Sequence, residues 1–216
     1  MKSNAFMFAL VADQVSSRLG PDRVPLALAA LSPTAMALPF ERTAGDELQG
    51  LCNEPAAVTT AVSQLTRLGD WRIGIGVGPV ASPLPDSTRA ARGPAYVAAR
   101  TAIERARRSP VQLALALTEH VSAADYPELT DATTDAETAL WLWRSTLSRR
   151  STEGWELMDL LDQGLTKADA AAQLGISPSA VSQRLGRAAA VEDARGAALA
   201  TRLLARVQEL GGTVQP

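Results

Sequence analysis

The sequence holds very little cysteine or histidine: among 216 residues there is one of each, Cys52 and His120. A single cysteine excludes an internal disulfide and any zinc site built on cysteine ligands. Cys52 ends an apolar run and has no histidine near it in the sequence, so we expect a core residue rather than a nucleophile. We expect His120 in a loop or at the surface rather than in a catalytic role.

Long hydrophobic runs are also missing. The longest apolar stretches, Phe6–Ala12 and Leu113–Leu117, are far too short to cross a bilayer. The N-terminus has one lysine, a short apolar run and then Asp13, which is not the pattern of a secretory signal. Hydrophobic residues make up 46% of the chain, as in ordinary globular proteins. We therefore expect a folded cytoplasmic protein with no membrane segment.

A strong positive charge is absent too. The formal net charge is −2, which by itself does not indicate a nucleic-acid partner. Positive charge is instead local: Arg144, Arg149 and Arg150 form one cluster, and Arg184 and Arg187 form a second. A weakly charged chain that binds DNA usually gains affinity by dimerising, because each subunit neutralises only a few phosphates. The charge distribution therefore favours a homodimer if DNA is the partner.

The front half alternates between strand and helix patterns. Apolar runs predict strands at residues 5–12, 38–44, 48–52, 71–80 and 111–118, and helical spacing predicts helices at 25–31, 55–68 and 94–108. Gly45, Asp46 and Glu47 form the expected tip of a hairpin. Glycines alternate along 71–80, so something must approach that face closely. The order β-α-β-β-α-β, with an extra helix and strand, predicts an α+β ferredoxin-like sandwich over residues 1–122.

From residue 123 to the end the pattern becomes helical. Thr134 and Glu137 have the spacing of a capping box, which predicts the start of a helix at that point. Further helices are expected at 153–161 and 189–210. Apolar residues follow one side of the last helix: Val191, Leu199, Leu203, Val207 and Leu210. This stripe could be a dimer seam or could cap the core of the domain, and the pattern favours neither.

Residues 166–188 predict two short helices joined by a tight turn. Thr166 has the position of a cap for a helix over 167–174, and Gly175 ends that helix in a left-handed turn. Ser177 caps the next helix, and Pro178 occupies its first position, where the missing N–H costs nothing.

This segment resembles the helix-turn-helix of sigma-factor region 4 and related bacterial regulators, in the small Ala171, the turn Gly175 and the apolar Val181 and Leu185. The resemblance implies that the second helix enters the major groove of double-stranded DNA by its N-terminal end. The candidates for base contacts are Ser179, Ser182 and Gln183, and the candidates for phosphate contacts are Arg184, Arg187, Arg149 and Arg150. An ordinary helical hairpin with solvated arginines is the alternative.

Two carboxylates of the front half fall where strands end or turn. Asp13 ends the first predicted strand, and Asp46 lies at the hairpin tip. If neighbouring strands bring them together, a hard cation such as Mg²⁺, bound with substrate phosphates, would offset their repulsion. Ser16, Ser17 and Arg18 could then offer backbone N–H groups and a guanidinium to phosphate. The alternative is structural, with Asp46 forming a turn and Asp13 capping the following helix.

Three blocks, at residues 9–13 (ALVAD), 42–46 (RTAGD) and 72–80 (RIGIGVGPV), resemble the class III nucleotidyl cyclase domain. GDELQGL, RIGIGVG and GPAYVAAR resemble the SatD family more closely, whose fold is cyclase-like. The resemblance covers about residues 4–118 and depends on the order and spacing of short motifs. It implies a site between two subunits.

The same resemblance assigns roles to individual residues. Asp13 and Asp46 would bind the metal, Arg42 would read the base, and Arg100 would stabilise the transition state. Tyr96 departs from the pattern, because cyclases have a ribose-orienting asparagine there. Its loss should sharply reduce cyclisation, which depends on orientation, so nucleotide binding is better supported than turnover.

Together these patterns predict a two-domain transcription regulator. Residues 1–122 would sense a nucleotide with Mg²⁺, and residues 123–216 would bind operator DNA as a homodimer. Ligand binding would act by favouring one spacing of the two reading helices. One alternative is an active Mg²⁺-dependent nucleotidyl cyclase or phosphotransferase with an accessory helix-turn-helix. A second is a regulator whose front domain serves only for dimerisation.

Overall fold

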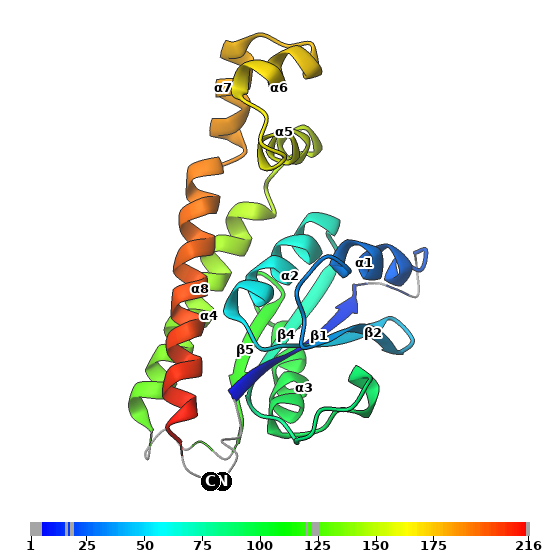
Figure 1. Ribbon diagram of the computed structural model, residues 1–216, viewed down its shortest axis with the longest axis vertical. Helices are drawn as coiled ribbons and strands as arrows, with labels where there is room; N and C mark the ends of the chain where they lie inside the picture. The colour runs from blue at the N-terminus through cyan, green and yellow to red at the C-terminus, as the bar shows by residue number, and fades with distance from the viewer. Residues whose placement is uncertain (1–5, 16, 18–19, 120, 122–125, 215–216) are drawn as a thin grey trace.

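The computed structural model describes residues 6–15, 17, 20–119, 121 and 126–214, and places a sheet beside a long pair of helices (Figure 1). Ser16, Arg18 and His120, which the sequence analysis singled out, lie outside the described residues. The elements in chain order are β1 (Phe6–Gln14), α1 (Val24–Leu31), β2 (Leu38–Ala44), β3 (Glu47–Cys52), α2 (Pro55–Leu68), β4 (Trp71–Pro79), the 3-10 turn η1 (Thr88–Ala90), α3 (Pro94–Ala106), β5 (Leu113–Leu117), α4 (Pro127–Leu147), α5 (Thr152–Asp162), α6 (Lys167–Leu174), α7 (Pro178–Arg187) and α8 (Ala190–Gly212).

The fold is α+β, with a mixed sheet and its helices in the first half and a mainly helical C-terminal region. The five strands have the order β2-β3-β1-β4-β5. β1 runs antiparallel to both of its neighbours, whereas β5 runs parallel to β4. β1 extends to Gln14, so Asp13 lies within the strand rather than at its end. The strands and helices predicted for the front half are all present.

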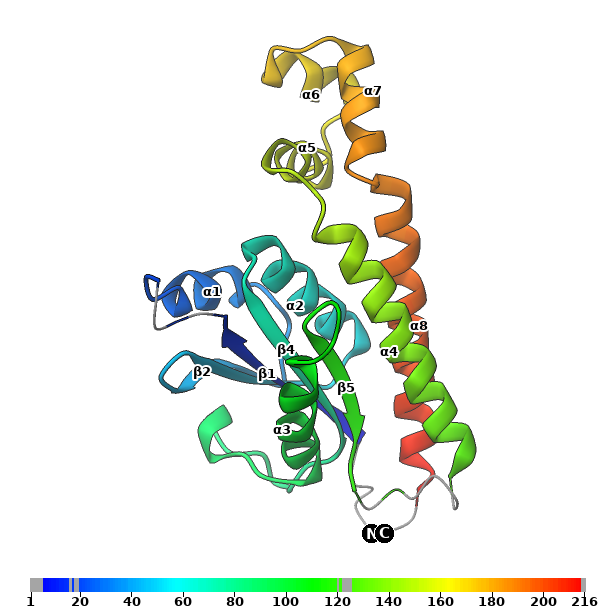
Figure 2. The same ribbon diagram turned by 180° about the vertical axis from the view of Figure 1, so that it is seen from behind.

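The sheet is covered on both faces, because successive side chains of a strand point to opposite sides. Phe8 and Leu10 of β1 belong to a large core that α1, α2, α4 and α8 complete. Ala9 and Val11 point the other way, into a smaller core under α3. Figures 1 and 2 show α2 and α3 on opposite sides of the sheet.

The glycines of β4 leave room for the backbone of α3. A Cβ atom on Gly76 would lie 2.1 Å from the carbonyl oxygen of Ala95 and 2.1 Å from the amide nitrogen of Ala99. A Cβ atom on Gly74 would lie 2.4 Å from the amide nitrogen of Ile103. Only glycine fits where helix and strand backbones approach so closely. The predicted close approach is confirmed, and its partner is a helix of the same chain.

The predicted capping box at the start of the helical region is wrong. α4 begins at Pro127, so Thr134 and Glu137 lie inside the helix. The Glu137 carboxylate instead accepts hydrogen bonds from the backbone N–H of Leu115, at 2.8 Å, and from Arg105, at 3.0 Å. A tertiary contact with β5 therefore explains the glutamate that resembled a local cap.

Further side chains of α4 hydrogen-bond to β5, to the residue before it and to β4. The Trp141 indole N–H donates to the carbonyl oxygen of Leu113 at 2.8 Å. The buried Arg144 guanidinium donates to the carbonyl oxygens of Gln112 and Trp71, at 2.5 Å each, and burial lowers its pKa to about 10. The bonds that Trp141 and Glu137 make to Leu113 and Leu115 satisfy polar groups of an edge strand that would otherwise be open to pairing. They also fix α4 to the sheet.

Residues on both sides of the predicted boundary at residue 122 share one core. Leu140 of α4 and Leu204 of α8 are fully buried in the same core as the sheet residues. A separate small core belongs to α5, α6 and α7. α4 and α8 therefore pack with the sheet, while the segment between them stands apart at one end (Figure 1). Within the described residues, no helix is both long and apolar enough to cross a membrane.

Candidate functional site

Local hydrogen bonds build α6 and α7 as predicted. The Thr166 hydroxyl accepts from the N–H of Asp169, and the Asp169 carboxylate accepts from the N–H of Thr166, at 3.2 Å each. Gly175 ends α6 in the left-handed conformation, with φ of 63°. The Ser177 hydroxyl then accepts from the N–H of Ala180 at 3.2 Å and so caps α7. Both predicted caps and the turn are confirmed.

The inward face of this unit is small and apolar. Val181 of α7 is fully buried, and Ala171 of α6 is 4% exposed. Leu157 of α5 packs against them, with Ile176 and Leu185 at the margin of the same core. Because Val181 and Leu185 point inward, most of the remaining positions of α7 turn outward.

The outward face of α7 is polar. Ser179, Ser182, Gln183 and Arg187 are exposed, and Arg184 is partly buried, with a guanidinium nitrogen 3.8 Å from the Glu156 carboxylate. Neither the Gln183 nor the Arg187 side chain hydrogen-bonds to another described residue. Their polar groups therefore remain available to a partner outside the chain.

Three of the predicted phosphate-binding arginines line one hollow. A cavity of about 490 Å³ lies between α7 and the start of α5, and Arg149, Arg184 and Arg187 all line it together with Gln183. Glu153 also lines it, and hydrogen bonds from Ser151 and the backbone lower the pKa of this glutamate. The hollow thus presents three guanidinium groups with a carboxylate at its margin.

Arg150 is placed differently from the prediction. Its side chain is only 1% exposed. The guanidinium donates to the carbonyl oxygen of Ala188 at 2.9 Å and to the Asp193 carboxylate at 2.8 Å. Arg150 is therefore not placed to contact a phosphate, because its charge is buried and holds the junction of α7 and α8.

A cation–π stack links this junction to the sheet region. The guanidinium carbons of Arg150 and Arg67 lie 4.3 Å and 5.3 Å from the centre of the Trp155 ring. Arg67 belongs to α2 and donates both terminal N–H groups to Asp159 of α5, at 2.6 Å each. The Arg67–Trp155–Arg150 stack therefore connects α5 to α2 and to the α7–α8 junction.

The second candidate site lies at the end of the sheet where Asp13 meets the β2–β3 hairpin. In the strand register Asp13 pairs with Glu47 on one side and Arg72 on the other. The Asp13 carboxylate accepts from Arg72 at 3.0 Å and lies 3.9 Å from Arg107. Burial raises the pKa of Asp13, although Arg72 opposes this shift. Asp46 lies nearby, in the turn of the hairpin.

The other predicted nucleotide-binding residues have partners within the chain. Arg42 forms an ion pair with Asp22 and lowers the pKa of that carboxyl, and Arg100 forms an ion pair with Glu47. Ser17 is partly buried in the turn after β1. The structure therefore brings Asp13 and Asp46 to one end of the sheet but gives Asp13, Arg42 and Arg100 partners of opposite charge.

The carboxylates as arranged do not fit Mg²⁺, which needs octahedral oxygen ligands. Both oxygens of Asp13 face guanidinium groups. Within the part of the chain that the structure describes, no three Asp, Glu, His or Cys side chains gather into a metal-binding group. Tyr96 is 9% exposed, and its hydroxyl is buried with no partner among the described residues. Tyr96 belongs to α3 and packs into the core between this helix and the sheet. Nucleotide binding at this end of the sheet stays a prediction.

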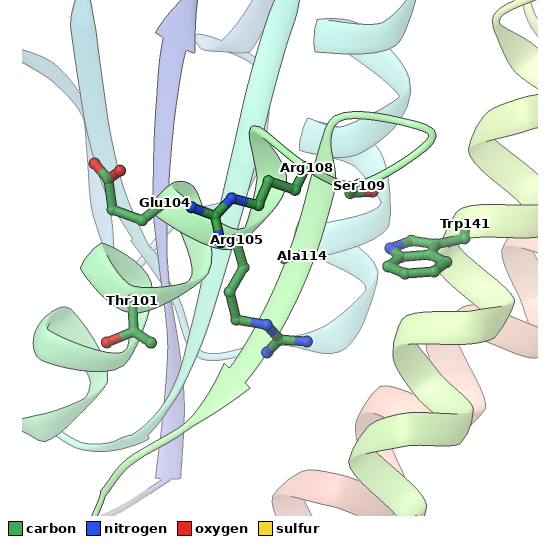
Figure 3. Close-up of a pocket in the computed structure, with 7 residues that line it drawn as sticks. All are labelled: Thr101, Glu104, Arg105, Arg108, Ser109, Ala114 and Trp141. Carbon is green, nitrogen blue, oxygen red and sulfur yellow. The ribbon is translucent and has the colours of Figure 1, made fainter.

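A further cavity of about 630 Å³ lies between the C-terminal end of α3 and α4 (Figure 3). Arg105, Arg108 and Trp141 line it, and none of the predicted nucleotide-binding residues does. Arg105 is engaged with the carbonyl oxygen of Leu115 and with Glu137. The cavity therefore adds no support to the predicted nucleotide site.

The sequence analysis missed the two arginines that neutralise Asp13. Arg72 lies inside a motif that was noted for its glycines, and Arg107 follows α3 without any motif. Comparison of the chain with known protein families and with curated proteins finds no match.

Proposed function

We propose that this chain is a DNA-binding transcriptional regulator in which α6 and α7 form a helix-turn-helix. The observation that supports this most directly is the division of α7 into two faces. Val181 is fully buried, while Ser179, Gln183 and Arg187 are exposed. A capped, outward-facing polar helix on a small independent core is what entry into the major groove requires.

The chemistry of this surface suits a duplex. Near the start of α7, Ser179, Ser182 and Gln183 offer hydrogen bonds to base edges, and a glutamine can pair with both polar groups of adenine. Arg149, Arg184 and Arg187 line the adjacent hollow and would bind phosphates on either side of the groove. Arg184 would exchange its distant contact with Glu156 for a phosphate.

We propose further that the sheet region is a ferredoxin-like, cyclase-like domain. The chain order β-α-β-β-α-β and the strand order β2-β3-β1-β4 support this assignment. Its proposed role is nucleotide sensing or dimerisation. A catalytic role has less support, because Arg72 and Arg107 face Asp13 and Tyr96 is buried.

The first test measures binding of a fluorescent random-sequence duplex by the full chain at low salt. We expect binding that weakens steeply with salt, because released counterions drive it. Arg187→Ala should weaken binding to all sequences and reduce the salt slope by about 1. Arg108→Ala is the matched control, since this exposed arginine lies after α3 and away from α7.

The second test selects preferred duplexes from a random pool and repeats the selection with Gln183→Ala. A bidentate glutamine contact discriminates between bases by about 1–3 kcal/mol, so the variant should lose preference at one position of the site. Absence of binding to any duplex at low salt would contradict the proposed function. So would equal losses for Arg187→Ala and Arg108→Ala.

A further inference from the structure

α4 and α8 form an antiparallel pair with one face turned away from the sheet (Figures 1 and 2). Arg206 of α8 pairs with Glu128 near the start of α4. Trp143 near the end of α4 donates to Asp193 near the start of α8 at 2.8 Å. These two contacts define which residues of the two helices lie at the same level along the pair.

Large apolar side chains are exposed on this pair. Leu142 of α4 is 68% exposed, and Val191 and Leu199 of α8 are 63% and 42% exposed. Val207 of the predicted apolar stripe is fully buried, and Leu203 and Leu210 pack against the same core. The C-terminal part of the stripe therefore packs on the core, whereas Val191 and Leu199 are exposed to solvent.

The same surface carries acidic residues on α4 and mainly basic residues on α8, where Glu192 and Glu209 are also exposed. The exposed acidic residues of α4 are Glu128, Asp131 and Asp135, and the exposed basic residues of α8 are Arg195, Arg202 and Arg206. Apart from Arg206 with Glu128, none of these forms an ion pair with another described residue. Exposed Ala194 and Ala198 add small positions on α8, where another helix can approach closely.

We propose that this surface binds a second copy of the chain, with α4 of one copy against α8 of the other. A twofold axis parallel to the helices relates the two copies without shifting either along that axis. Each residue therefore lies at the same height in both copies. This axis brings Asp131 and Asp135 opposite Arg202 and Arg206 of the second copy, and the reverse on the other side. The acidic residues of α4 in each copy thus meet arginines of α8 in the other. Leu142 lies near the level of Val191 of the other copy, and Leu199 lies near the level of Asp135.

This arrangement extends the proposed function. It rests on that function only where two copies of α7 are said to contact DNA together. α5, α6 and α7 all lie at one end of the α4–α8 pair (Figure 1). An axis parallel to the pair places both copies of α7 at the same end, as a two-half-site operator requires. The dimer itself can be measured without DNA.

The experiment is sedimentation of the full chain over a concentration series without DNA. We expect a reversible dimer, and Leu142→Glu should raise its dissociation constant by about 30-fold or more, as for a hot-spot residue. Val97→Glu is the matched control, because Val97 is 55% exposed on α3, away from this surface. Circular dichroism and the melting temperature would show that both variants fold.

A charge exchange tests the pairing directly. Asp135→Arg should weaken the dimer, and adding Arg202→Asp in the same chain should restore it. A monomeric wild type, or a dimer indifferent to Leu142→Glu, would overturn the proposal and leave the surface to a different protein. A dimer that responds as expected but binds no duplex would support this inference and contradict the DNA-binding function instead.

Discussion

Adjacent residues Arg149 and Arg150 should respond in opposite ways to replacement by alanine. Arg150→Ala removes hydrogen bonds to Ala188 and Asp193 and the stack on Trp155, and leaves Asp193 without its cation. Breaking a buried ion pair costs about 3 kcal/mol or more. For a chain of this size we therefore expect the melting temperature to fall by about 6–12 °C.

Arg149→Ala removes an exposed charge from the hollow beside α7 and breaks no hydrogen bond among the described residues. Its melting temperature should stay unchanged, whereas the salt slope of duplex binding should fall by about 1. Differential scanning calorimetry and fluorescence anisotropy on both variants give the comparison. If Arg150→Ala lowers the salt slope by the same amount and leaves the melting temperature unchanged, our assignment of a buried structural arginine is refuted.

Three further predictions concern the sheet region. Gly76→Ala should destabilise the chain by about 3 kcal/mol or more in urea unfolding, because its Cβ meets backbone on two sides, while Gly78→Ala should cost clearly less; equal effects would contradict the close packing. Burial raises the folded-state pKa of Asp13, so the protonated carboxyl favours the folded state. The free energy of unfolding, compared with that of Asp13→Asn, should therefore rise as the pH falls through the folded-state pKa and level off below the ordinary pKa of 3.8. A free energy of unfolding that instead rises with increasing pH would contradict this prediction. Tyr96→Phe should be neutral or stabilising by about 1 kcal/mol in thermal unfolding, because the buried hydroxyl has no partner among the described residues, and a marked loss would reveal a hydrogen bond.

The features that the sequence predicted well are those determined by neighbouring residues. The caps and the turn of this segment each act within one turn of backbone, so their order in the chain was enough to place α6 and α7. They are Thr166 with Asp169, Gly175, and Ser177 with Pro178. The glycines of β4 were equally informative, because their spacing alone requires a close neighbour. The identity of that neighbour, α3, depends on the fold.

The features that the sequence did not predict depend on contacts between distant elements. Asp13 meets Arg72 only through the register of β1 and β4, which no local pattern records. Glu137 had the spacing of a cap but hydrogen-bonds to β5. Arg150 looked like the exposed Arg149 beside it, yet Ala188 and Asp193 enclose it from the other end of the helical segment.

The contacts of α5 bear on how a ligand could influence DNA binding. α4 is fixed to the sheet, through Trp141 to Leu113 of β5 and through Arg144 to Trp71 of β4. A change in the sheet therefore reaches α7 only if a softer connection allows it. The Arg67–Asp159 pair is such a connection, because both side chains are partly exposed and join α2 directly to α5. Coupling between a ligand site and a DNA-binding site requires a structural element with two arrangements, and each site must favour one arrangement over the other. If a ligand changes duplex affinity and Arg67→Ala abolishes that change, α2 is this element; if the change persists, the signal passes through α4 and α8.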